Sequence, residues 1–267
     1  MLDKITDWFK TFPQVRAVGI GGSTASGYSD PASDIDLYIF TDKDVPVAER
    51  MDFIGKISSR HEVGQDYFGP DDEFFYDEIG REIDCIYFDT SWIEDMVDDI
   101  WIRHDARNGY TTCFFYTIRS CTVLFDKDGW LKDMKDKIGT DYPEELRENI
   151  IRRNMLLLQD KPFSSYSEQI AKAVKRKDSV SIIHRTAAFL ESYFDIIFAV
   201  NGLLHPGEKR LVGYALKNCR ALPEGFENNI NALLSSMSSD KDSLPRITET
   251  MVQELKKTLV SEGLCLK

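Results

Sequence analysis

The sequence of 267 residues has few cysteines, and their spacing excludes the usual structural tasks of this residue. There are five, an odd number, and no two form a Cys-x-x-Cys pair, so we predict neither a disulfide framework nor a zinc site. No run of about 18 uncharged apolar residues occurs, so no membrane span is expected. The N-terminus also lacks the apolar core of a secretory signal. These absences favour a protein of the reducing cytosol.

Several common ligand-binding motifs are missing as well. No glycine-rich segment ends in Gly-Lys-Ser/Thr, which excludes a P-loop, and no Gly-x-Gly-x-x-Gly fingerprint of a dinucleotide site occurs. The four histidines show neither His-x-His nor His-Glu-x-x-His spacing, so none is predicted to bind a metal. A phosphate-bearing ligand would therefore need a different kind of site.

Positive charge is scarce in the first half of the chain. Residues 1–140 carry 28 acidic and 15 basic side chains, whereas residues 141–267 carry 17 and 18, and the whole chain has a net charge of -12. Phosphate backbones are bound by clustered lysine and arginine, so we do not expect a nucleic-acid partner. If the ligand is rich in phosphate, metal ions must supply much of the compensating charge.

The pattern of apolar residues changes near residue 140. Before it, short strands alternate with helices, including predicted strands at 15–20, 34–40 and 122–125, a helix at 47–60 and a hairpin joining 74–76 to 82–88. Ser91 is the expected cap of a helix that begins at Trp92. After Pro143 only helical spacing is found, with Pro245 among the expected breaks between helices. We therefore predict a small α/β domain over 1–140 and an all-α domain over 141–267.

The predicted helices of the second half are 144–160, 165–177, 180–201, 208–219, 226–237 and 247–262.

Three features of the first half point to one site. A strand runs into Gly21-Gly22-Ser23, where glycine lets backbone amides approach an anion and Ser23 adds a hydroxyl donor. Asp34 and Asp36 are two residues apart and point to one face of a strand, where they repel each other unless a cation lies between them. Asp84 lies within another apolar strand. If these strands are neighbours, three carboxylates converge, and an all-oxygen ligand set suits Mg²⁺ or Mn²⁺.

Each of these features also has a simpler explanation. The glycines could form an ordinary tight turn, Asp34 and Asp36 could belong to the solvated face of an edge strand, and Asp84 could pair with Arg81. The metal-site hypothesis is favoured because all three explanations would have to hold together at the spacing that the chemistry requires.

Gly22-Ser23, followed after about ten residues by Asp34-Ile35-Asp36-Leu37, resembles the signature of the DNA polymerase β-type nucleotidyltransferase superfamily. Within it, the sequence is most similar to small bacterial lincosamide and aminoglycoside nucleotidyltransferases, which carry a helical domain behind the catalytic one. Segments 122–129 and 205–211 also resemble stretches that recur in this group. The resemblance implies an α+β fold, with a small mixed-sheet catalytic domain followed by an all-α helical bundle.

The resemblance also implies roles for individual residues. Gly22 and Ser23 would hold the triphosphate of an NTP, with ATP expected, while Asp34, Asp36 and Asp84 would bind Mg²⁺ or Mn²⁺. An acceptor hydroxyl would attack the α-phosphorus and pyrophosphate would leave. Asp84 and Glu191 are the alternative general bases.

Lys209, predicted at a helix N-terminus, would contact the triphosphate.

The expected acceptor is a small hydroxyl compound, such as an antibiotic. Residues 66–99 hold 13 acidic side chains and one basic one, which favours a cationic acceptor. Two other functions stay open, namely a toxin-like nucleotidyltransferase that modifies protein or tRNA and a nucleotide-binding regulator without turnover.

Overall fold

A computed structural model describes residues 2–21, 34–67, 69–160 and 164–264. The chain divides into two compact units. Unit 1 comprises Met1–Asp99 and Thr117–Gly139, and unit 2 comprises Ile100–Tyr116 and Thr140–Lys267. The predicted fold class, an α+β chain with a mixed sheet and a following helical region, is confirmed. The division into a catalytic domain 1–140 and a helical domain 141–267 stays a proposal.

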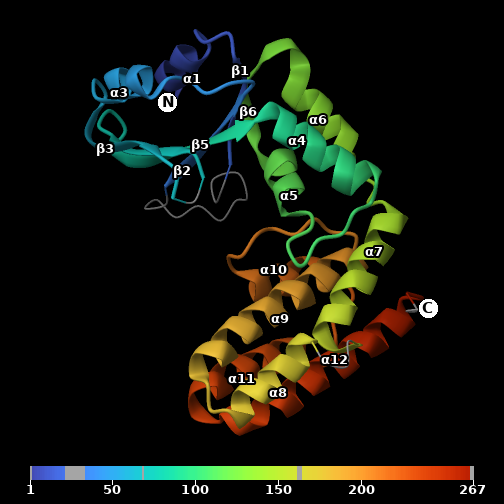
Figure 1. Cartoon of the computed structure of the whole chain (residues 1–267). Helices are drawn as coiled ribbons and strands as arrows, with labels where there is room; N and C mark the ends of the chain where they lie inside the picture. The colour runs from blue at the N-terminus through green and yellow to red at the C-terminus, as the bar shows by residue number, and fades with distance from the viewer. Residues whose placement is uncertain (1, 22–33, 68, 161–163, 265–267) are drawn as a thin grey trace. The chain divides into compact units, whose positions relative to one another are not determined.

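Unit 1 is built on a six-stranded sheet in the order β3-β4-β5-β2-β1-β6 (Figure 1). Strands β2 and β5 are parallel, and the other neighbours are antiparallel. The strands are β1 Val15–Ile20, β2 Ile35–Thr41, β3 Ser58–Gln65, β4 Asp71–Tyr76, β5 Arg81–Asp89 and β6 Thr122–Asp126. The helices are α1 Asp3–Phe9, α3 Val47–Ile54, α4 Thr90–Met96, the 3-10 turn Lys127–Gly129 and α6 Trp130–Ile138.

One face of this sheet carries the hydrophobic core of unit 1. The predicted apolar positions Ile35, Leu37 and Ile39 of β2 are all buried there. They pack with alternate residues of β1, β4 and β5 and with side chains of α1 and α3. Because side chains alternate along a strand, the residues between them project from the opposite face.

The opposite face is divided between aromatic and acidic side chains. Towards the carboxyl ends of β2 and β5, Phe40 and Phe88 stack 5.7 Å apart, and they contact Trp130 of α6 and Trp92 of α4. Towards the amino ends of the same strands, the face carries carboxylates instead. Helices α4 and α6 thus pack on one end of this face, and the carboxylates lie at the other.

Two local predictions in unit 1 were wrong. The helix predicted over 47–60 ends at Ile54, and Ser58 begins the edge strand β3. Pairing with β4 decides the structure there, since a half-exposed edge strand needs few apolar residues. The cap of α4 is Asp89, whose side chain accepts a hydrogen bond from the Trp92 amide, rather than Ser91. The predicted hairpin between β4 and β5 is present.

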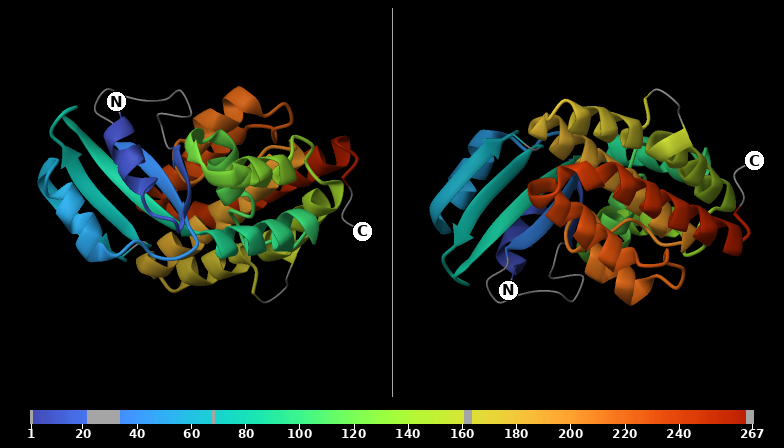
Figure 2. Two further views of the ribbon diagram at one scale, coloured as in Figure 1. Left: turned by 90° about the horizontal axis from the view of Figure 1, so that it is seen from above. Right: turned by 90° about the horizontal axis from the view of Figure 1, so that it is seen from below.

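Unit 2 is helical, and its long helices lie beside one another in Figures 1 and 2. Helices α7 and α8 pack on α9, and α12 packs against α8 and α11. The π-helix Val97–Ile102 and α5 Cys113–Ser120 each have residues in both units. The elements that follow are α7 Glu144–Met155, a π-helix Leu156–Asp160, α8 Tyr166–Lys175, α9 Ser179–Val200, α10 Leu211–Asn218, α11 Phe226–Ser239, a 3-10 turn Lys241–Ser243 and α12 Leu244–Ser261.

Pro245 does not separate two helices, as predicted, but lies in the first turn of α12. A proline is tolerated at this place because first-turn amides have no partner within the helix. Among the helices of the described ranges, none is both long enough and apolar enough to cross a membrane.

A buried carboxylate anchors the segment 107–112 inside unit 2. Asp195 of α9, 1% exposed, accepts hydrogen bonds from the amide and hydroxyl of Thr111, at 3.1 and 2.7 Å, and from Nδ2 of Asn154 at 3.1 Å. Asn154 in turn accepts from the Gly109 amide at 3.1 Å. Burial raises the pKa of Asp195 to about 7, and these hydrogen bonds oppose the shift.

Candidate active site

The site is assembled where the parallel strands β2 and β5 lie side by side. Asp36 is paired with Asp84 in their register, so both side chains project from the same face of the sheet. Asp34 immediately precedes β2, two residues before Asp36. The predicted condition, that the strands carrying these residues are neighbours, is therefore met.

The end of β1 approaches the same place. The Gly21 amide donates a hydrogen bond of 2.9 Å to the carbonyl of Asp36. A Cβ atom at Gly21 would lie 1.8 Å from the ring of Tyr38, so only glycine allows this approach. The predicted triphosphate ligands Gly22 and Ser23 lie outside the described residues.

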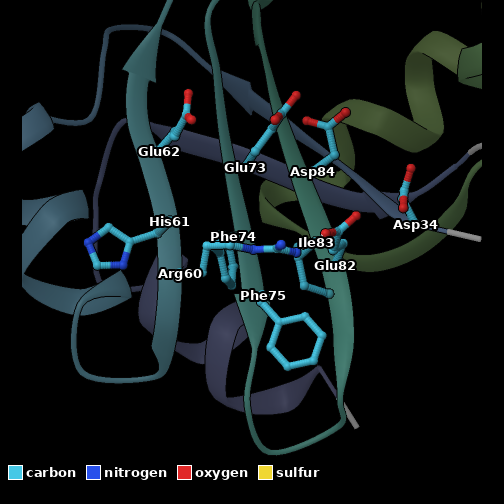
Figure 3. Close-up of a pocket in the computed structure, with 10 residues that line it drawn as sticks. All are labelled: Asp34, Arg60, His61, Glu62, Glu73, Phe74, Phe75, Glu82, Ile83 and Asp84. Carbon is cyan, nitrogen blue, oxygen red and sulfur yellow. Dashed lines mark hydrogen bonds and ion pairs between the residues drawn. The ribbon is translucent and has the colours of Figure 1, made fainter.

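The row of carboxylates continues across β4 to the edge of the sheet. Glu73 of β4 is the register partner of Asp84, and Glu62 of β3 is the partner of Glu73. Figure 3 shows Glu62, Glu73 and Asp84 on successive strands, with Asp34 beyond them. Oxygen atoms of Asp71, Glu73 and Asp84 lie within 4.8 Å of one another and could hold a metal ion.

Sequence reasoning missed Glu62, Asp71 and Glu73. In the sequence, residues 71–73 are all acidic, so the alternation of exposed and buried positions along β4 becomes visible only in the structure.

A pocket of about 310 Å³ opens over this row. Besides the acidic residues, the ring of Phe75 contributes to its wall, with Arg60 lying above the ring, 5.9 Å from its centroid, and ion-paired with Glu82 (Figure 3). The lining residues are Asp34, Arg60, His61, Glu62, Glu73, Phe74, Phe75, Glu82, Ile83 and Asp84. The pocket therefore combines one aromatic surface with a strongly acidic floor.

Asp84 has the most perturbed carboxyl of this row. Burial raises its pKa to about 7, and the charges of Asp36, Asp71, Glu73 and Asp34 add to the shift. Its Oδ1 atom is buried and has no hydrogen-bond partner among the described residues. A buried carboxylate oxygen without a partner is costly unless a cation or a proton compensates it. A cation or a proton beside Asp84 would therefore stabilise this arrangement.

Residues 3–68 match a family model described as "Polymerase beta, Nucleotidyltransferase". The chain carries a polymerase β-type nucleotidyltransferase domain. The match spans Asp34 and Asp36, and it confirms both the predicted superfamily and the predicted enzyme class, nucleotidyltransferase. Residues 111–211, most of them in unit 2, match a second model, a domain of unknown function named DUF4037. This range includes the segment 122–129 and reaches the end of the segment 205–211, which the sequence comparison had singled out.

Solved structures of nucleotidyltransferases resemble the chain at low identity. A nucleotidyltransferase-like protein from Exiguobacterium sibiricum is 10% identical, with a TM-score of 0.45 over 98% of this chain and 74% of that one. A STING-associated CdnE c-di-GMP synthase from Capnocytophaga granulosa is 12% identical, with a TM-score of 0.30 over 98% and 79%. The CCA-adding enzyme of Thermotoga maritima, complexed with tRNA, has the same identity and score over 98% and 81%. No protein of curated function matches the sequence.

The residues of the nucleotidyltransferase domain fit the divalent metal that such a family implies. The donor set consists of carboxylate oxygens only, which is the set that Mg²⁺ and Mn²⁺ prefer. The partnerless Oδ1 of Asp84 has the character of an unused ligand atom. Asp34, Asp36 and Asp84 remain the predicted ligands, and Asp71 and Glu73 are additional candidates on β4.

Two predicted site residues belong to unit 2. Glu191 is half-buried on α9, and burial raises the pKa of its carboxyl. Lys209 is exposed, and it lies in the turn before α10 rather than inside the predicted helix 208–219. Arg210 forms the N-cap in a left-handed conformation, which delays the start of the helix. The roles of Glu191 as a base and of Lys209 as a phosphate contact stay predictions.

Proposed function

We propose that the protein transfers an NMP group from an NTP, with ATP expected, to a hydroxyl of a small acceptor and releases pyrophosphate. The single observation that carries this proposal is the register pairing of Asp36 on β2 with Asp84 on β5. Strand β2 also lies within the residues that match the nucleotidyltransferase family model. It brings two acidic residues to one face, where both can bind the same cation. A bound Mg²⁺ or Mn²⁺ would supply positive charge that compensates the phosphate groups.

In this proposal the residues of the domain hold and orient the reactants. Asp34, Asp36 and Asp84 would hold the metal, and Gly22 and Ser23 would contact the phosphates. The acceptor oxygen forms a bond to the α-phosphorus as the bond to the β-phosphate oxygen breaks. The acceptor proton passes to a carboxylate, for which Asp84 and Glu191 are the two candidates. Lys209 would add a phosphate contact.

The pocket supports a cationic acceptor over a nucleic acid. Five of its lining residues are acidic, against one arginine that is already ion-paired with Glu82. A field of this sign repels a phosphate backbone and attracts amines.

The four cysteines within the described residues are free thiols, which supports a reducing compartment such as the cytosol.

Incubation of the protein with labelled NTPs, Mg²⁺ and panels of amine-bearing and neutral hydroxyl acceptors tests the proposal. Release of pyrophosphate together with a labelled acceptor is expected, and it should vanish in Asp36→Asn. Labelling of tRNA or protein instead would favour the toxin-like alternative. Tight NTP binding without any transfer would favour a regulator that does not turn over its ligand.

A further inference from the structure

A buried charged network lies on the core face of the sheet, directly beneath the carboxylate row. Asp72 of β4 is fully buried, and Nη1 of Arg50 in α3 donates to its Oδ1 at 2.5 Å. The Gly64 amide of β3 donates to the same oxygen at 2.7 Å, and the Tyr87 hydroxyl of β5 donates to Oδ2 at 2.6 Å. One carboxylate thus ties together a helix and three adjacent strands.

The remaining contacts of Arg50 complete this network. Its Nε donates to the Val45 carbonyl at 3.0 Å, and its guanidinium lies 4.6 Å from the centre of the Tyr87 ring. Both charged side chains are almost inaccessible, Arg50 at 7% exposure and Asp72 at 0%. A buried ion pair of this kind is a weak source of net stability but specifies one arrangement of its partners.

The three strands joined by this network are the strands that carry the acidic row. Asp72 lies between Asp71 and Glu73 in β4, and its register partner, Cys85, follows Asp84 in β5. Like charges on neighbouring strands repel each other and push the strands apart. Glu62, Glu73 and Asp84 are register partners on β3, β4 and β5, so their charges face one another across neighbouring strands. The network on one face therefore opposes the repulsion on the other.

The register of the edge strand also depends on Asp72. Pairing of β3 with β4 shifts between Val63 and Gln65, where Gly64 adopts a φ of 79°. This is a bulge, and its amide points to Asp72 instead of following the ladder. A Cβ at Gly64 would also lie 3.0 Å from Val47 of α3. The bulge follows the Val63–Asp72 pair, which is next to the Glu62–Glu73 pair, so it helps to fix the register in which these two glutamates lie opposite each other.

We propose that Asp72, with Arg50 and Tyr87, is a positioning residue that holds β3, β4 and β5 in the register required by the carboxylate row. This inference rests on the proposed function, because the row has to bind a divalent cation. Asp72 and its partners touch neither the metal nor the substrate. They act through the strands on Glu73 and Asp84.

Two variants of different severity test the proposal in the full-length protein. Tyr87→Phe removes only the hydroxyl that links β4 to β5, and Asp72→Asn keeps the shape of the side chain while removing its charge. Mn²⁺ affinity is measured by calorimetry, and the melting temperature is measured alongside. Supporting groups of this kind alter metal affinity by about tenfold or more, and we expect such a loss in Asp72→Asn and a smaller one in Tyr87→Phe.

Thr90→Val is the matched control, because it also removes one hydroxyl from a part-buried hydrogen bond, the 2.6 Å contact of Thr90 with Asp42 beside the other end of β2 and β5. It should lower the melting temperature and leave Mn²⁺ affinity unchanged. Should Asp72→Asn fail to fold, Tyr87→Phe decides alone. Wild-type affinity in the folded variants, at a lowered melting temperature, would reduce the network to a structural role and overturn the proposal.

Amide hydrogen exchange of the metal-free protein gives a second readout. We expect Tyr87→Phe to speed exchange in β3–β5, and unchanged exchange there would count against positioning. If the wild-type protein binds no Mn²⁺, the proposed function fails, while the exchange measurement still decides whether the network opposes the repulsion.

Discussion

Two aspartates, one in each unit, have their pKa raised to about 7 by burial and yet have opposite surroundings. Asp195 of unit 2 is surrounded by donors, with Thr111 and Asn154 satisfying both of its oxygens. Asp84 of unit 1 is surrounded by other carboxylates, and its buried Oδ1 has no donor within the described part of the chain. A raised pKa alone therefore does not identify a functional carboxylate.

What separates the two residues is whether the protein itself completes their hydrogen bonding. A satisfied buried carboxylate fixes the segments that donate to it, as Asp195 fixes segment 107–112. A buried carboxylate that lacks hydrogen-bond donors and is surrounded by like charges is stabilised only when a cation or a proton compensates its charge. We therefore interpret Asp195 as structural and Asp84 as a ligand. Three predictions test this distinction, and a fourth concerns the acidic residues around Asp84.

The largest effect is expected on activity, from removing single charges in the row. Asp34→Asn, Asp36→Asn or Asp84→Asn should lower the rate of transfer by about a thousandfold or more, because a metal deprived of one ligand no longer holds the triphosphate. The melting temperature should stay equal or rise, since repulsion within the row is relieved. Rates and melting curves are measured for all three. Full activity in any one of them would remove that residue from the metal site.

The reverse outcome is expected for Asp195. Asp195→Ala leaves the buried amide of Thr111 without its acceptor, at a cost of about 1–3 kcal/mol, and it also removes the hydrogen bonds that the Thr111 hydroxyl and Nδ2 of Asn154 donate to Asp195. Urea unfolding should show a loss of several kcal/mol, while Mn²⁺ affinity of the folded protein stays at the wild-type value. Asn154→Ala is a companion variant that disturbs the same cluster. Loss of metal binding without loss of stability would reverse the proposed roles of Asp84 and Asp195.

The pH dependence of stability distinguishes the two aspartates more finely. Both have a folded-state pKa of about 7 against an ordinary value of 3.8, so the folded state binds more protons than the unfolded state between these values. The free energy of unfolding of the metal-free protein should therefore fall as the pH rises through this window.

Asp84→Asn and Asp195→Asn should each flatten this decline. Mg²⁺ should restore stability at about pH 8 more than at about pH 5, because the ion binds the ionised form of Asp84. In Asp195→Asn this rescue should persist, and in Asp84→Asn it should be lost. A Mg²⁺ effect that is equal at both pH values would argue against Asp84 as a ligand. Melting curves at the two pH values, with and without Mg²⁺, supply the measurement.

The same contrast explains what the sequence could predict. Asp34, Asp36 and Asp84 were predictable from the sequence because each lies on or beside a short apolar strand, and their spacing matches a known signature. Glu73 was not, because its place beside Asp84 depends on the register of β4 and β5. Glu62 was hidden further, since no strand was predicted for its segment, and β3 forms there by pairing with β4.

The Asp195 cluster could not be predicted at all. Its bonds join residues 41 and 84 positions apart, and nothing in the sequence around Thr111, Asn154 or Asp195 indicates that they meet. Helices α7 and α9, by contrast, follow from local spacing and capping, so their positions in the sequence were predicted within a few residues, apart from the π-helical turn after α7. Local structure was thus more predictable than the polar contacts that lock it.

The smallest effect is expected at the rim of the row, in the acceptor. Glu73 and Glu62 lie one and two strands beyond Asp84, so Glu62 is about 10 Å from it at the usual strand spacing. At that distance a carboxylate attracts a cationic acceptor without touching the reacting atoms, and salt screens the attraction over about 10 Å at 0.1 M. The KM of an amine-bearing acceptor should therefore rise with ionic strength, whereas the KM of a neutral acceptor should not.

Glu62→Gln should raise the KM of the amine-bearing acceptor by roughly two- to tenfold, as expected for one partly exposed charge pair, and weaken its dependence on salt. Glu49→Gln, which removes an equally exposed charge from α3, is the control and should leave both values unchanged. An amine KM that ignores both salt and Glu62→Gln would show that the acidic pocket serves the metal alone.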